Sequence, residues 1–160
     1  MEHPIPPVYH QNSKILILGT FPSVKSREGQ FFYHHPQNRF WSVMSSILGD
    51  ERPITIADKK DMLLRNQIAV WDVIKSCDIS GSSDSSIKNV VPNDLLEILK
   101  QSEIKGIMAN GGRAYDLYMK YSYPMTGREI IKLPSTSPAN AAFSLERLIE
   151  IWADSLRGYL

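Results

Sequence analysis

The sequence predicts an α/β fold, a three-layer α/β/α sandwich with a central, mainly parallel four-stranded sheet. Four short apolar runs are continuous rather than alternating, as strands buried on both faces of a parallel sheet are. Amphipathic helical patterns separate these runs, and strands that alternate with helices favour this sandwich. The 160 residues are enough for one sizeable core, so we expect a single domain over residues 1–160.

The predicted elements follow from the side chains of each segment. The strands are rich in Ile, Val, Leu or Met and cover residues 14–18, 67–73, 105–109 and 129–133. Apolar residues recur at helical spacing between them, which predicts helices over 39–48, 56–64, 92–100 and 111–120. In the last predicted helix one face carries Leu145, Leu148, Ile149, Trp152 and Leu156.

In such a fold the loops that follow the strands gather at one edge of the sheet, where open α/β sheets bind ligands. These loops are 19–38, 72–89, 110–113 and 134–140. Residues 78–89 are Ser-rich and polar, which is typical of a mobile or ligand-facing loop. We therefore expect any functional site to be assembled from these four loops.

Composition excludes several classes of protein. The net charge of +1 counts mildly against a nucleic-acid partner, although local patches can still supply one. The single cysteine, Cys77, excludes an intrachain disulfide, a zinc cluster and an iron–sulfur site, and it suits a reducing cytosol. No apolar run approaches the length of a membrane span. We therefore expect a cytoplasmic monomer with no cofactor, no metal and no membrane contact.

Residues 30–38 read QFFYHHPQN and are too aromatic for a plain connection. Three consecutive aromatic side chains cannot all enter the core from a loop, and an exposed ring beside a pocket is a stacking platform for a base or sugar. His34 and His35 lack the spacing of paired metal ligands, so we expect no metal here. Asn38 precedes a predicted helix and can be either its N-cap or a catalytic group.

Two further segments also have a structural and a functional interpretation. Residues 19–23, GTFPS, are a tight strand exit whose backbone amides can hold a phosphate. In residues 133–140, LPSTSPAN, Ser137 can cap the final helix, and the three hydroxyls also suit a phosphate backbone. No GxSxG, GxxxxGK[ST] or GxGxxG motif is present, which argues against elbow-type hydrolases, nucleotide triphosphatases and dinucleotide enzymes.

Together these segments resemble the uracil-DNA glycosylase superfamily. Residues 19–22, GTFP, match its first motif, and 133–141, LPSTSPANA, stand where its second motif lies. Residues 35–41, HPQNRFW, match the pattern HPxNRFW of the mismatch-specific and thymine glycosylase branch. With QFFYHHPQN at 30–38, the chain is most similar to the branch called hypoxanthine- or deoxyinosine-DNA glycosylases.

This resemblance implies a monofunctional DNA glycosylase of base excision repair. It would hydrolyse the N-glycosidic bond of hypoxanthine in DNA, with uracil as a second candidate, after flipping the base out of the duplex. Other branches position the attacking water with Asp or Asn where Phe21 stands here, so the catalytic role carries over to Asn38. The resemblance assigns Tyr33 to stacking on the base, Phe21 to an apolar wall and Asp72 to the edge of the base. The rival interpretation of Asp72 is a pair with Lys75 or a turn cap.

The candidate contacts to DNA phosphates are Ser23, Arg113, Ser135, Thr136 and Ser137, and Asn140 lies where relatives place the wedge that fills the vacated stack. Three alternatives remain open. Phe21 speaks against a mismatch-specific uracil or thymine glycosylase. The missing carboxylate in the first motif leaves room for a lesion-binding protein without turnover. The last alternative is an α/β protein that binds a free nucleobase or nucleotide.

Overall fold

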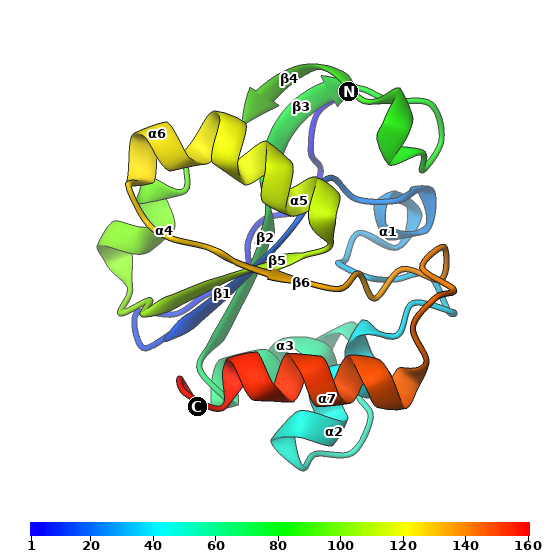
Figure 1. Cartoon of the computed structure of the whole chain (residues 1–160), viewed down its shortest axis with the longest axis vertical. Helices are drawn as coiled ribbons and strands as arrows, with labels where there is room; N and C mark the ends of the chain where they lie inside the picture. Colours follow the sequence, from blue (N-terminus) through cyan, green and yellow to red (C-terminus); the bar gives the residue numbers. More distant parts are fainter.

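Four parallel strands form the central sheet in a computed structural model that describes residues 1–160 (Figure 1). β1 (Ile15–Gly19) lies between β2 (Ile68–Asp72) and β5 (Gly106–Asn110), and β6 (Ile131–Leu133) pairs with the other side of β5. After β1 the chain therefore adds β2 on one side of it and then adds β5 and β6 on the other side. The predicted mainly parallel four-stranded sheet is confirmed.

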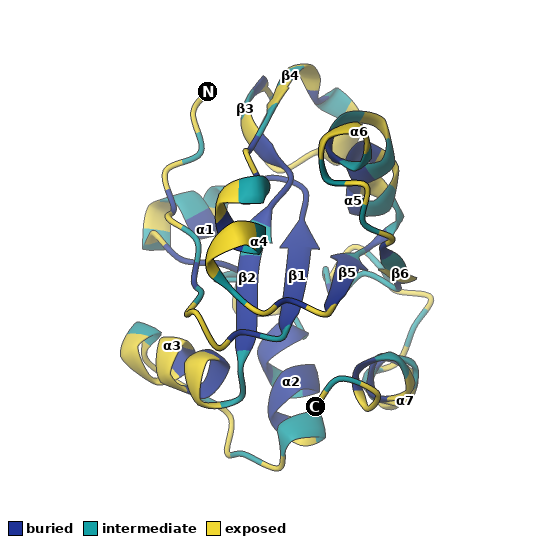
Figure 2. Ribbon diagram, turned by 90° about the vertical axis from the view of Figure 1, so that its left-hand side faces the viewer, coloured by how far each residue is buried: buried dark blue, intermediate teal, exposed yellow.

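Helices cover both faces of this sheet, as the predicted sandwich requires (Figures 1 and 2). The first face carries α2 (Phe40–Leu48), α3 (Ile56–Arg65) and α7 (Leu145–Leu156). The second face carries α4 (Leu96–Gln101) and α5 (Gly112–Leu117). β1 is buried along its whole length, which explains its continuous apolar sequence.

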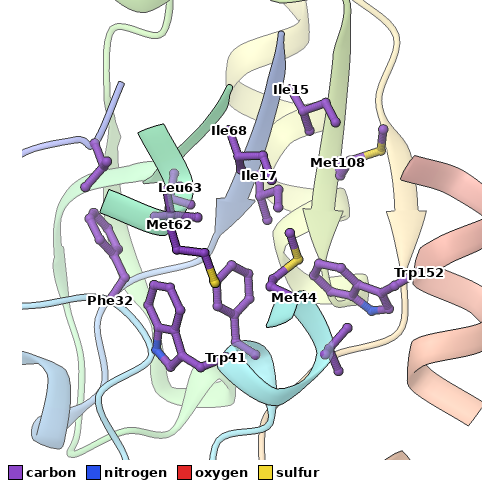
Figure 3. Close-up of a cluster of buried hydrophobic side chains, with 14 of the residues drawn as sticks. Ile15, Ile17, Phe32, Trp41, Met44, Met62, Leu63, Ile68, Met108 and Trp152 are labelled. Carbon is purple, nitrogen blue, oxygen red and sulfur yellow. The ribbon is translucent and has the colours of Figure 1, made fainter. Parts of the chain in front are cut away.

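Alternate side chains of β1 enter two separate apolar clusters. Ile15 and Ile17 pack in the cluster under α2, α3 and α7, which Figure 3 shows together with Met44 and Trp152. Leu16 and Leu18 belong to the cluster on the opposite face. The sheet is thus held from both sides, and its loop-bearing edge is anchored to two cores.

Three features within the predicted loops differ from the sequence prediction. A hairpin of β3 (Ile74–Asp78) and β4 (Lys88–Pro92) extends from β2, and its polar, partly exposed residues hid the strand pattern. η1 (Asp84–Ser86) lies inside the hairpin connection. α1 (Val24–Gly29) forms in the long loop after β1.

The helix that begins at α5 runs further than residue 120. A turn of π-helix, η2 (Tyr118–Ser122), joins α5 to α6 (Tyr123–Thr126). This continuation contributes Tyr118, which is fully buried, to the second apolar cluster. No helix in the structure combines the length and the apolar character needed to cross a bilayer.

The last helix begins where the apolar pattern starts, at Leu145, and not directly after Ser137. Its N-cap is Ser144, whose hydroxyl accepts a hydrogen bond from the Arg147 amide at 3.2 Å. The interpretation of Ser137 as the cap of this helix is therefore wrong. Residues 134–143 form a non-helical loop that returns toward the sheet edge.

Candidate active site

A pocket of about 380 Å³ opens at the carboxyl ends of the strands. All four predicted loops line it, through Phe21 and Asn38, Asp72, Asn110, and the segment 135–139. The pocket lies where the chain order reverses around β1, which is the usual place for a ligand in an open α/β sheet. The expectation that one site draws on these four loops is confirmed.

Asn38 lies in the pocket wall at the start of α2, with its carboxamide held in one orientation. Its Oδ1 accepts hydrogen bonds from the Phe40 backbone amide at 2.9 Å and from the Thr136 hydroxyl at 2.9 Å. A backbone amide can only donate, so the oxygen must face Phe40. Both lone pairs of Oδ1 are thereby used, and the Nδ2 amide remains as the free donor of this side chain.

Thr136 links Asn38 to the end of β5. Its hydroxyl accepts a hydrogen bond from Asn110 Nδ2 at 3.0 Å, and its amide donates to Asn110 Oδ1 at 3.0 Å. The residue is fully buried, and its only hydroxyl proton is donated to Asn38, so none remains for a phosphate oxygen. Thr136 is therefore not available to a DNA phosphate, and its predicted contact is replaced by a role in positioning Asn38.

Arg39 holds the segment 136–143 against α2. Its guanidinium donates to the backbone carbonyls of Ser137 at 3.1 Å, of Asn140 at 2.9 Å, and of Phe143. Its own amide donates to the Thr136 carbonyl at 3.1 Å. Sequence reasoning missed this clamp, although its signal was the Arg that directly follows the candidate catalytic Asn.

Asp72, at the end of β2, is paired with a residue that the sequence did not indicate. Its Oδ2 lies 2.7 Å from His3 Nε2, and the two side chains are 5% and 3% exposed. The Ile5 amide donates to His3 Nδ1 at 3.1 Å, so the ring proton lies on Nε2 and is donated to the carboxylate. The structure shows neither a pair between Asp72 and Lys75 nor a turn capped by Asp72, so the rival interpretation is not supported.

The second carboxylate oxygen of Asp72 lies directly over Gly19. The two residues are paired in the β1–β2 register, and a Cβ atom at Gly19 would collide with Asp72 Oδ1. Glycine is therefore required at the end of β1 by a close approach, and not by an unusual backbone angle. This is the physical reason for the glycine that opens the first motif.

Two of the three consecutive aromatic residues, Phe32 and Tyr33, line the pocket, whereas Phe31 lies wholly in the core. Phe32 is almost fully buried, and the Tyr33 ring stacks on Phe40 with centroids 4.1 Å apart. Its backbone φ of 51° lies in the left-handed region, which is uncommon for a residue other than glycine. The phenol oxygen is buried without a partner; burial, and then the Asp72 charge, raise its pKa.

Phe21 lines the same pocket and is 8% exposed. Its ring meets the His3 ring edge to face, with centroids 5.6 Å apart. The Phe21 side chain thus forms one apolar wall of the pocket and also packs against the His3 ring of the His3–Asp72 pair.

The other predicted DNA contacts divide into two groups. The hydroxyls of Ser23, Ser135 and Ser137 lie at the pocket and also accept hydrogen bonds from nearby backbone amides at 3.1–3.2 Å. Arg113 is exposed on α5 outside this pocket. Asn140 donates to the Ser135 carbonyl at 3.0 Å and lines an adjoining cavity.

Asp84 is a pocket residue that sequence reasoning missed because it lies in the Ser-rich connection of the hairpin. It lines both the main pocket and the adjoining cavity. Asp84 is exposed to solvent as a residue, but the protein around its carboxyl raises its pKa by partial desolvation; Arg113 opposes this shift, and Asp72 adds to it. The mouth of the pocket thus carries one carboxylate beside the predicted phosphate contacts.

Fold and pocket together define a class of protein, and comparison with known families identifies it. The family model described as the uracil DNA glycosylase superfamily matches residues 6–155, and the chain belongs to that superfamily. The resemblance and the fold predicted from the sequence are both confirmed.

Individual proteins that are similar to this chain carry more specific names than the superfamily. A protein of Methanosarcina barkeri (strain Fusaro / DSM 804) named hypoxanthine DNA glycosylase is 33% identical over 157 residues, covering 95% of this chain and 96% of its own. A protein of the same name from Methanosarcina acetivorans is 34% identical over 143 residues, covering 89% and 90%. A Methanosarcina acetivorans protein solved by solution NMR, provisionally named a uracil DNA glycosylase, superposes with a TM-score of 0.82 at 33% identity, covering 97% of this chain and 96% of its own.

Proposed function

We propose that this chain is a monofunctional DNA glycosylase that releases hypoxanthine from deoxyinosine in DNA, with uracil as a second substrate. The observation that carries the proposal is the joint placement of Asn38 and Asp72 in one pocket of a uracil DNA glycosylase fold. The relatives named hypoxanthine DNA glycosylase cover nearly the whole chain and support the same substrate.

The target base must leave the duplex to reach this pocket. Phe21 supplies an apolar wall and Tyr33 a ring for the flipped base. A base inserted between them would present its edge to the floor of the pocket, where Asp72 lies at the end of β2. Pairs containing a deaminated base open more easily than normal pairs, which adds to the selectivity.

Asp72 distinguishes a deaminated base from its parent by hydrogen bonding. His3 already donates to its Oδ2, so the carboxylate acts as an acceptor toward the pocket. Hypoxanthine carries a proton at N1 and uracil one at N3, whereas adenine and cytosine carry a lone pair at these atoms. Adenine would face the carboxylate acceptor to acceptor, and a buried carboxylate without a donor is costly. One residue thus accounts for the recognition of both deaminated bases.

Asn38 acts as a hydrogen-bond donor during bond cleavage. Its carbonyl is occupied by Phe40 and Thr136, and the free Nδ2 amide can donate to the departing base, on which negative charge develops. The sugar acquires oxocarbenium character, as in other glycoside hydrolyses. For Asn38 to orient the attacking water through its carbonyl, the Thr136 hydroxyl would have to turn away.

The phosphate contacts proposed for DNA are now those of Ser23, Ser135, Ser137 and Arg113, with Asn140 beside them. The three serines surround the pocket into which the base would insert, so they are well placed for the phosphates of the flipped nucleotide. Binding that relies on phosphates weakens as salt rises. We further propose that the protein acts as a monomer in the cytoplasm.

The test is base release from duplex oligonucleotides that carry deoxyinosine, deoxyuridine, deoxyadenosine or deoxycytidine at one position. The proposal predicts release from the first two and none from the parents. Free deoxyinosine serves as a control, and its hydrolysis at an equal rate would favour a nucleoside-binding protein. Tight lesion binding without release would favour the lesion-binding alternative, with Phe21 as the reason.

A further inference from the structure

A second cavity, of about 430 Å³, lies on the other side of the loop that carries Tyr33 and Asn38. Its remaining walls are Trp41 of α2, the connection 52–54, and Lys59 of α3. It shares Tyr33, His35 and Asn38 with the base pocket, so one loop separates the two. No acidic side chain lines this cavity.

Lys59 is buried in the cavity wall without an ionic partner. The residue is 9% exposed, and its ammonium makes neither a salt bridge nor a hydrogen bond. Its nearest aromatic partner is the Trp41 ring, whose centroid lies 5.2 Å from Nζ. The ammonium keeps contact with solvent through the cavity, but it has lost part of its water and gained no counter-ion, which is unfavourable. Burial, and then the charge of Arg52, lower its pKa.

The groups beside Lys59 offer it no negative charge either. Arg52 is exposed at the rim and brings a second positive charge toward Lys59. The His34 ring packs on Gly29, and its Nδ1 is buried without a hydrogen-bond partner. Burial, and then the Lys59 charge, lower the pKa of His34, so this ring offers a hydrogen bond and not a further charge. Two cationic side chains, Arg52 and Lys59, and two imidazoles, His34 and His35, therefore line a cavity that has no acidic side chain in its wall.

We propose that this cavity binds a backbone phosphodiester of the DNA strand that carries the flipped nucleotide. The inference rests on the proposed function, since the polyanion that enters the base pocket is the one that reaches across the shared loop. Lys59 supplies the buried charge, Arg52 closes over the phosphate from the rim, and the Trp41 face keeps the ammonium in place. A base in one pocket and a phosphate in the other would hold residues 33–38 from both sides.

The experiment compares Lys59→Gln with Lys60→Gln. Lys60 is the next residue of α3 and is exposed, so the two variants change the net charge equally. Binding to a duplex with a stable abasic-site analogue is measured over a range of salt concentrations. Lys59→Gln should bind about tenfold more weakly, and the slope of log K against log salt should fall by about one. Lys60→Gln should change neither by much. Equal behaviour of the two variants would overturn the proposal.

A second arm identifies the phosphate. Each phosphate near the lesion is replaced in turn by an uncharged methylphosphonate, and wild type should lose affinity at one position to which Lys59→Gln has become insensitive. Arg52→Gln, a surface change, should show the same coupling if Lys59→Gln disturbs folding. Inorganic phosphate that binds the free protein at this cavity, with no methylphosphonate coupling, would assign the cavity to a free anion and contradict the proposal.

The two proposals fail in different ways. If the chain is not a glycosylase, wild type itself releases no base from deoxyinosine duplexes. If only the phosphate cavity is wrong, wild type releases hypoxanthine and Lys59→Gln matches Lys60→Gln in both binding and salt slope.

Discussion

His3 donates a hydrogen bond of 2.7 Å to Asp72, and the two buried side chains join the N-terminal segment to the floor of the pocket. The Ile5 amide fixes the tautomer of the imidazole, so the contact holds one carboxylate oxygen and leaves the other over Gly19. A residue 69 positions away in the chain thus orients the group that we propose reads the base.

Removal of the donor should weaken base recognition without removing the pocket. His3→Ala leaves Asp72 Oδ2 without its partner, and we expect about a tenfold loss in single-turnover release of hypoxanthine, in line with a charged hydrogen bond of about 1.5–3 kcal/mol. His10→Ala, an exposed histidine of the same segment, is the matched control. Equal rates for the two variants would show that the pair does not position Asp72.

Asp72→Asn tests the base-reading role directly. The carboxamide keeps the shape of the side chain but can offer a donor to the pocket, which suits the N1 lone pair of adenine. We expect the preference for deoxyinosine over deoxyadenosine, measured as the ratio of their single-turnover rates, to fall by about tenfold or more. An unchanged ratio would remove Asp72 from the specificity mechanism.

Gly19→Ala should displace the Asp72 carboxylate by a change in the neighbouring strand, β1. The new methyl group would collide with Asp72 Oδ1 at a buried position, and such overpacking costs about 1–3 kcal/mol of stability. We expect a lower melting temperature together with lower hypoxanthine release. Gly158→Ala is the control, because a Cβ at that glycine meets no atom. Full stability and activity in Gly19→Ala would show that the approach of Asp72 to β1 is looser than described.

Much of the fold follows from the sequence because its strands are buried on both faces, which leaves continuous apolar runs such as Ile15–Gly19. The hairpin does not, since β4 is mostly exposed and carries no such run. The site residues found by resemblance lie in contiguous motifs. Asp84 was missed because it reaches the pocket, and His3 because it reaches Asp72, only through tertiary structure, from segments that carry no motif. The prediction that Ser137 caps the last helix was wrong because Arg39 holds that segment in a non-helical path.

The Asp84 carboxyl predicts that DNA binding depends on pH. At neutral pH its carboxylate repels DNA phosphates at the mouth of the pocket, so Asp84→Asn should bind duplex DNA more tightly than wild type. Its raised pKa means that the wild-type carboxyl takes up a proton at a higher pH than an ordinary aspartate. The difference in affinity should therefore shrink as the pH falls, before other aspartates titrate. A constant difference across the acid range would contradict this assignment.

The central claim is that hypoxanthine release depends on the carboxamide of Asn38. The most direct measurement is the single-turnover rate of base release from a deoxyinosine duplex by wild type, Asn38→Ala and Asn12→Ala, where Asn12 is an exposed asparagine near the start of the chain. The account predicts release by wild type and Asn12→Ala, and a loss of about a hundredfold or more in Asn38→Ala, as for other donors that stabilise developing charge. Equal release by all three proteins would contradict it.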